Sequence, residues 1–74
     1  MTPIIKINAR EVVKEFGGIS IVIEKFSPYK KITRGGIEKW RERNSIPSDA
    51  LLLFAVIAKK EKRNFDVTKF VFWT

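Results

Sequence analysis

The side chains best suited to bind a ligand lie between residues 33 and 43, in the stretch TRGGIEKWRER. Arg34 can donate two parallel hydrogen bonds to a planar acceptor such as the edge of guanine, and Thr33 can offer a hydroxyl or a methyl group. Gly35 and Gly36 stand where a helix is expected to begin, although each costs a helix roughly 1 kcal/mol relative to alanine. Without side chains they would let a base edge or a phosphate approach the backbone, whose first N–H groups can bind an anion. The alternative is that the glycines only form the turn before a helix that begins one or two residues later.

The positive charge of the chain is concentrated around this stretch. The formal net charge is +7 at pH 7, and residues 25–47 hold seven basic and two acidic side chains, which gives +5 for that segment. Residues 1–24 balance to zero, and residues 48–74 carry +2. A local excess of this kind is typical of a protein that binds a polyanion, with nucleic acid first, although a solvated basic surface would have the same composition.

The composition excludes several kinds of chemistry. The chain has neither cysteine nor histidine, which removes disulfides, thiolate zinc sites, cysteine nucleophiles and histidine-based catalytic triads. Its eight acidic residues are scattered, mostly beside lysine or arginine, so we expect no enzyme, metal, cofactor or small-molecule substrate. The longest apolar run, residues 50–58, is far shorter than the roughly 20 residues of a membrane span. Since the N-terminus also lacks the features of a signal peptide, we expect no membrane partner and a cytoplasmic location.

A strand and a helix are expected before the basic stretch. The β-branched opening, residues 2–7, predicts an edge strand. Asn8 is placed to cap the first helix, and Glu11, three residues on, is placed to complete a capping box. Gly17 and Gly18 are expected to end this helix in left-handed conformation.

Two further helices are expected to position the binding side chains. Ser20 is placed to cap a second helix that stops before Pro28, and Thr33 is placed to cap a third that runs to residue 43. In the third helix, Ile37 and Trp40 share one face, so we expect them to hold the helix to the core while its charged side chains face outward.

A fourth helix is expected after Pro47, with Ser48 as its cap and Asp49 near its positive end. It carries the run ALLLFAVIA, which is apolar nearly all the way round and which a monomer of 74 residues could hardly cover. A second copy of the protein, or the C-terminal tail, is expected to cover it. Part of the tail, residues 64–74, is expected to form a strand that pairs with the opening strand or crosses to a partner subunit. The residues expected to take part in dimerisation are Leu52, Phe54, Ile57, Phe70, Phe72 and Trp73.

Residues 16–47, about two fifths of the chain, contain three short motifs in order. An FGG run precedes the second helix, an apolar pattern lies within it, and the run IxxWRxRxxIP follows. The residues that carry these motifs are Phe16, Gly17, Gly18, Val22, Ile23, Phe26, Ile37, Trp40, Arg41, Arg43, Ile46 and Pro47. In these motifs the chain resembles the phage Cro-like and Cro/C1-type helix-turn-helix repressors and their YdaS-like relatives.

The chain departs from the pattern of that family at the junction of the two motif helices. The turn is about four residues longer than the tight turn of the family, and the extra piece is roughly PYKK. Ser27 stands where the family usually has glycine, and Ile23 where it usually has alanine. Lys30 and Lys31, in the added piece, would lie beside the backbone of a bound duplex, where phosphate contacts are natural.

The resemblance implies a single, mainly α domain over residues 1–74, of the four- to five-helix lambda-repressor/Cro-like helix-turn-helix class, to which the N- and C-terminal segments can add a small β ribbon. It implies a homodimeric, sequence-specific repressor of phage or prophage origin that acts in the cytoplasm of a bacterium or an infected host. Such a protein occludes a promoter on double-stranded DNA, with the motif at about residues 20–43 and residues 33–43 in the major groove. The residues expected to contact DNA are Thr33, Arg34, Gly35, Gly36, Glu38, Lys39, Arg41, Arg43, Lys30, Lys31 and Ser20.

Two other functions are compatible with the same sequence. The fold can serve as a protein–protein adaptor or inhibitor, in which case the apolar fourth helix and tail would be the working surface. The protein can also bind DNA in an architectural role, as a recombination directionality factor does. Affinity for DNA that rests on several phosphate contacts falls steeply with salt, whereas an apolar protein interface hardly responds. An architectural protein would bend DNA at several adjacent sites.

Overall fold

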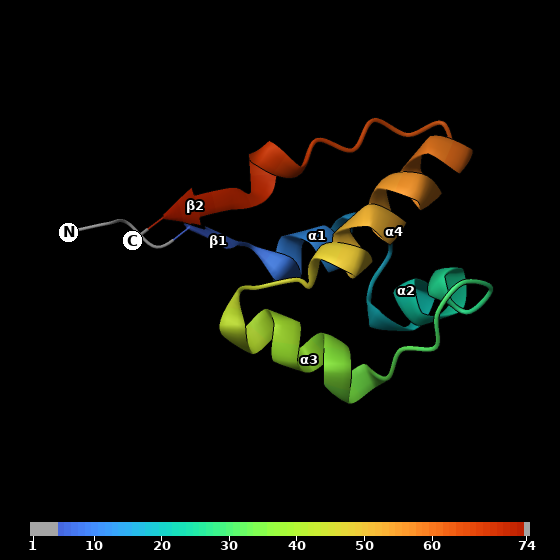
Figure 1. Cartoon of the computed structure of the whole chain (residues 1–74), viewed down its shortest axis with the longest axis horizontal. Coiled ribbons are helices and arrows are strands. Elements are labelled where there is room, and N and C mark those ends of the chain that lie inside the picture. The colour runs from blue at the N-terminus through green and yellow to red at the C-terminus, as the bar shows by residue number, and fades with distance from the viewer. Residues whose placement is uncertain (1–4, 74) are drawn as a thin grey trace.

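The computed structural model of the protein describes residues 5–73 (Figure 1). In chain order its elements are β1 (Ile5–Ile7), α1 (Ala9–Glu15), α2 (Ile19–Phe26), α3 (Arg34–Arg43), α4 (Ser48–Lys60), the 3-10 helix η1 (Val67–Phe70) and β2 (Val71–Trp73). The described part of the chain is therefore mainly helical with one two-stranded antiparallel sheet, as predicted. Residues 2–4 of the expected first strand lie outside the described residues.

The two ends of the described chain meet in the small sheet (Figure 1). Ile5 pairs with Trp73 and Ile7 with Val71, so the tail pairs with the opening strand of its own chain, one of the two expected arrangements. The Asn8 N–H extends this contact by donating to the carbonyl of residue 70 at 2.7 Å. The same N–H is therefore unavailable to a carboxylate at position 11, and the expected capping box does not form, although the Asn8 side chain does cap α1.

The core is organised around Phe54, whose side chain is completely buried on α4. Its ring centroid lies 4.8 Å from Phe16, 4.9 Å from Phe26, 6.3 Å from Trp40 and 6.2 Å from Phe65. Rings from the C-terminal cap of α1, from α2, from α3 and from the tail thus surround a single side chain of α4. The prediction that Trp40 is a core residue is confirmed.

This core overturns two of the predicted dimerisation residues. Phe54 is 0% exposed and Ile57 is 5% exposed, so both fill the interior of a single chain. An apolar pattern that runs all round a helix cannot show which arc is buried, and here one side of α4 packs inward while Leu52 remains 68% exposed. In the tail, Phe70 and Phe72 are half-buried, and Trp73 is exposed.

The helix starts differ from the predictions at two serines. Ser20 is the second residue of α2, which begins after Gly18 without a side-chain cap, so the expected cap is wrong. Ser48 is the first residue of α4, and Pro47 takes the capping position without a side-chain bond. Within residues 5–73, none of the helices reaches the length and apolar character that crossing a bilayer requires.

Candidate nucleic-acid interface

The start of α3 is held by Thr33, whose extended backbone precedes the helix and whose Oγ1 accepts a hydrogen bond from the Gly36 N–H at 3.1 Å. This confirms the predicted cap. Because α3 already begins at Arg34, both glycines lie inside its first turn, and the alternative in which they only form the preceding turn is wrong. The N–H of Gly36 is used by the cap, so an anion at this end would have to use the earlier N–H groups.

Gly35 has no structural reason to lack a side chain. The positive-φ glycines of the described chain are Gly17 and Gly18, so the backbone at Gly35 suits any L-residue. A Cβ built on Gly35 would meet no atom within 4 Å, whereas one on Gly36 would lie 3.4 Å from the Thr33 hydroxyl. The missing side chain at Gly35 therefore leaves the outer surface of α3 open without serving the packing of the domain.

The outward face of α3 carries charges of both signs. Ile37 and Trp40 turn to the core as predicted, since the first is buried and the second packs 6.4 Å from Phe26. The exposed residues of the helix are Arg34, Gly35, Glu38, Lys39, Glu42 and Arg43. Three of these are cationic and two anionic, and the Arg34 Nε lies 3.4 Å from a Glu38 carboxylate oxygen. The exposed face of α3 is thus polar, carries charges of both signs, and has only a small net positive charge.

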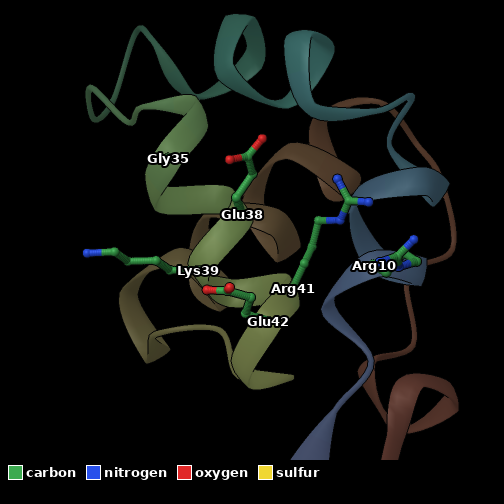
Figure 2. Close-up of a pocket in the computed structure, with 6 residues that line it drawn as sticks. All are labelled: Arg10, Gly35, Glu38, Lys39, Arg41 and Glu42. Carbon is green, nitrogen blue, oxygen red and sulfur yellow. The ribbon is translucent and has the colours of Figure 1, made fainter.

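A shallow groove of about 560 Å³, here called the α1–α3 groove, runs beside this face (Figure 2). It is lined by Arg10, Gly35, Glu38, Lys39, Arg41 and Glu42. Figure 2 shows Arg41 directed from α3 toward α1, while Lys39 extends to the opposite side of α3. The groove therefore has cations from two helices that are far apart in sequence and packed together in the fold.

A second groove, the α1–α2 groove, continues from the first because Arg10 and Arg41 line both. Its volume is about 490 Å³, and its wall includes Lys14 and the glycine pair before α2. The first turn of α2 has no side-chain cap, so its leading N–H groups add positive potential at this end. Ser20, predicted as a contact at this helix start, is exposed on the first turn.

Arg41 lies deeper than the sequence suggested for a phosphate contact. Its side chain is half-buried, and its Nε is a buried donor without a hydrogen-bond partner among the described residues. A buried donor of this kind costs free energy unless an acceptor reaches it. Arg41 thus places a positive charge in the lining of both grooves. Arg43 is exposed at the end of α3.

The two loop lysines have different environments. Lys30 binds the carboxylate of Asp49 at the start of α4, and this hydrogen bond holds the pKa of Asp49 below its usual value. Lys31 is exposed and carries no ion pair within residues 5–73. The loop itself, residues 27–33, is held at its start by hydrogen bonds from the N–H groups of Tyr29 and Lys30 to the carbonyl of residue 26.

The sequence reasoning missed three residues that the fold brings to this surface: Arg10, Lys14 and Glu42. Arg10 and Lys14 are one helical turn apart on the polar side of α1, opposite its buried valines, and this spacing was the available signal. Nothing in the sequence alone indicated that α1 would lie against α3. No family model, curated protein or solved structure was found to match the chain.

Proposed function

We propose that the protein is a sequence-specific transcriptional regulator, a Cro-like repressor, that binds double-stranded DNA through the outer face of α3. One observation carries the proposal: Gly35 leaves the exposed start of α3 bare although neither its backbone conformation nor its surroundings exclude a side chain. A position that weakens a helix without helping the fold is expected where another molecule approaches the backbone closely. In both adjoining grooves the cations from α1 and α3 outnumber the carboxylates, which favours an anion as this molecule.

The charges divide between base reading and backbone binding. Glu38 and Glu42 would repel phosphates, so α3 suits the base edges of the major groove, where a carboxylate can accept from the cytosine amino group and Arg34 can donate to guanine. The phosphate contacts would come from outside the helix, chiefly from Lys31, Arg10 and Lys14. Releasing Arg34 from its exposed pair with Glu38 costs about 0.3–0.5 kcal/mol, less than the roughly 1–3 kcal/mol of a bidentate base contact.

In this proposal α2 and α3 act as the two helices of a helix-turn-helix joined by residues 27–33, a longer connection than the usual turn of 3–4 residues. The half-buried Ile23 packs against the core, so the larger side chain at this position is accommodated there. The ion pair from Lys30 to the start of α4 ties the long connection to the rest of the domain. Occlusion of a promoter is the mechanism inferred for such a protein.

The test is a mobility-shift assay with random-sequence duplex at about 50 mM and about 200 mM salt, the range over which several phosphate contacts give a steep fall in affinity. The variant Arg34→Ala/Lys39→Ala removes two cations from the outer face of α3. The matched control, Lys62→Ala/Lys69→Ala, removes two exposed cations that line neither groove.

We expect salt-sensitive binding by the wild type, a marked loss in the α3 variant, and at most a small loss in the control. Equal losses in both variants would reduce the interaction to nonspecific attraction by net charge. Absence of binding by the wild type at low salt would overturn the proposal. Selection of a binding site from a random library then tests specificity, and bending at adjacent sites would indicate the architectural role instead.

A further inference from the structure

The exposed side of α4 has a regular pattern that neither the core nor the proposed DNA-binding surface uses. Asp49, Leu52, Val56 and Lys59 are all exposed and follow one another at intervals of three, four and three residues. Residues at this spacing lie along one face of a helix. We call these four residues the α4 stripe. Leu52 is 68% exposed and Val56 is 43% exposed, so the middle of the stripe is apolar while its ends carry opposite charges.

An apolar groove lies next to the stripe, between α4 and the segment that leads into η1. Its volume is about 420 Å³, and its lining residues carry no charge: Ser48, Leu51, Leu52, Ala55, Phe65 and Val67. Leu52 therefore projects at the edge of a hollow that can receive an aliphatic side chain. Projecting apolar side chains beside a hollow on the same surface suit the self-complementary contact of a two-fold interface between identical chains.

We propose that a second copy of the chain docks on the α4 stripe, with the two α4 helices antiparallel about a two-fold axis midway between Leu52 and Val56. Asp49 precedes Leu52 by the same three residues that separate Lys59 from Val56. Antiparallel pairing therefore sets Leu52 against Val56 of the partner subunit and Asp49 against Lys59 of the partner subunit, twice over.

Charge complementarity selects this occupant and this orientation. In a parallel pair Asp49 would face its own copy, and so would Lys59, which is repulsive at both ends. The antiparallel arrangement also sets each helix N-terminus against the C-terminus of its neighbour, which the helix dipoles favour. Asp49 already binds Lys30, but its side chain remains 59% exposed and can accept a second cation.

Burial of the stripe would also add stability that a domain of this size lacks. A short chain removes a modest fraction of its apolar surface from water, and self-association is a common way to remove more. Pairing along one 13-residue helix and its neighbouring groove gives an interface at the small end of the observed range. The dimer should therefore dissociate on dilution.

The proposal is independent of the DNA-binding assignment, because the α4 stripe and the exposed face of α3 share no residue. Sedimentation of the protein alone, without DNA, over concentrations from about 5 µM to about 1 mM tests it, a range that spans affinities of about −7 to −4 kcal/mol. The wild type is expected to pass from the chain mass of 8.6 kDa to twice that mass as concentration rises.

Leu52→Glu is the decisive variant and Ile21→Glu its matched control, since Ile21 is an exposed aliphatic residue on α2, away from the stripe. Leu52→Glu should raise the dissociation constant by about tenfold or more, while Ile21→Glu should leave it unchanged. Both substitutions are on the surface, so circular dichroism should show the same helix content in both. If Leu52→Glu leaves dimerisation intact and Trp73→Glu abolishes it, the partner docks on the β ribbon and the proposal is overturned.

A charge-reversal cycle tests the orientation. Asp49→Lys and Lys59→Asp should each weaken the dimer, and the double variant should restore it because the opposite charges again face each other across the two-fold axis. A double variant as weak as the more affected single variant would exclude antiparallel pairing in this register. A wild type that stays at 8.6 kDa up to about 1 mM would overturn the proposal whatever the DNA-binding result.

Discussion

The helices α3 and α4 each turn one face to solvent, but the two exposed faces are built differently. α3 buries Ile37, packs Trp40 against the core, and shows six exposed residues that are charged or lack a side chain. α4 buries Ala50, Phe54, Ile57 and Ala58 and still exposes leucine and valine between charged ends. Helix α3 gives up helical stability at a glycine that the fold does not need, whereas α4 supplies the centre of the core. The charged side chains of both signs on α3 suit a partner with several hydrogen-bonding groups. The apolar stripe on α4 suits a partner surface that excludes water.

The largest effect should come from the buried side of α4. We expect Phe54→Ala to cost about 3–5 kcal/mol, because it removes the ring that contacts four other aromatic side chains. A chain of this length has a free energy of unfolding of only about 4–11 kcal/mol, so the variant should lose a large part of its stability. Leu52→Ala, two residues away, should change the stability of the monomer by no more than about 0.5 kcal/mol.

Urea unfolding followed by circular dichroism measures both variants, at a concentration low enough to keep the chain monomeric. A similar loss in both would mean that the exposed and buried arcs of α4 are assigned wrongly. Comparable stability of Phe54→Ala and the wild type would remove the aromatic cluster as the centre of the core.

The cap of α3 should give the next largest loss of stability. Thr33→Ala removes the hydroxyl that accepts the Gly36 N–H and should cost about 1 kcal/mol, whereas Thr33→Ser keeps the acceptor and should cost much less. Ser20→Ala is the matched control, because Ser20 lies within the first turn of α2 and caps nothing. Thermal unfolding separates the three variants. If Ser20→Ala lost as much as Thr33→Ala, the two helix starts would not differ as described.

Thr33 caps its helix as predicted, whereas Ser20 and Ser48 do not, and this difference shows how well local sequence predicts helix caps. Short-range patterns located the four α-helices, the caps at Asn8 and Thr33 and the left-handed glycines at 17 and 18, because these depend on groups within a few residues. They missed the 3-10 helix η1 in the tail. The serine caps failed by one or two residues, because α2 begins at Ile19 after Gly18 and α4 begins at Ser48 after Pro47.

Features that depend on which elements meet were beyond the sequence. The buried arc of α4 could not be identified, because an almost wholly apolar helix has no preferred side until its neighbours are known. Arg10 and Arg41 line the same grooves only because α1 packs against α3. The candidate site was therefore predicted on α3 itself and missed where it extends to α1.

Gly35 allows stability and binding to be separated. Gly35→Ala should stabilise the fold by up to about 1 kcal/mol, because the methyl group meets no atom within 4 Å and alanine favours the helix. If the bare backbone is where DNA approaches, the same substitution should weaken DNA binding by about tenfold, or about 1.4 kcal/mol. Thermal unfolding and the mobility-shift assay give the two readouts on one sample.

Gly18→Ala serves as the control for Gly35→Ala, because its φ of +103° is unfavourable for any L-residue and the substitution should destabilise the fold. A more stable Gly35→Ala protein with unchanged DNA affinity would leave the glycine unexplained by binding. It would also remove the observation on which the proposed function chiefly depends.

The smallest effect concerns the carboxylate at the start of α4, where the loop before α3 is attached. The hydrogen bond from Lys30 lowers the pKa of Asp49 in the folded protein relative to its ordinary value of 3.8. A carboxyl whose folded pKa is depressed stabilises the fold at pH values above its unfolded pKa, and that contribution is lost as pH falls through the folded pKa. Acidification below about pH 4 should therefore cost the wild type slightly more stability than it costs Asp49→Asn. Because the group is exposed, added salt should reduce the difference. Thermal unfolding between neutral pH and the acid limit compares the two proteins, and parallel curves would show that the ion pair adds nothing measurable to the attachment of the loop to α4.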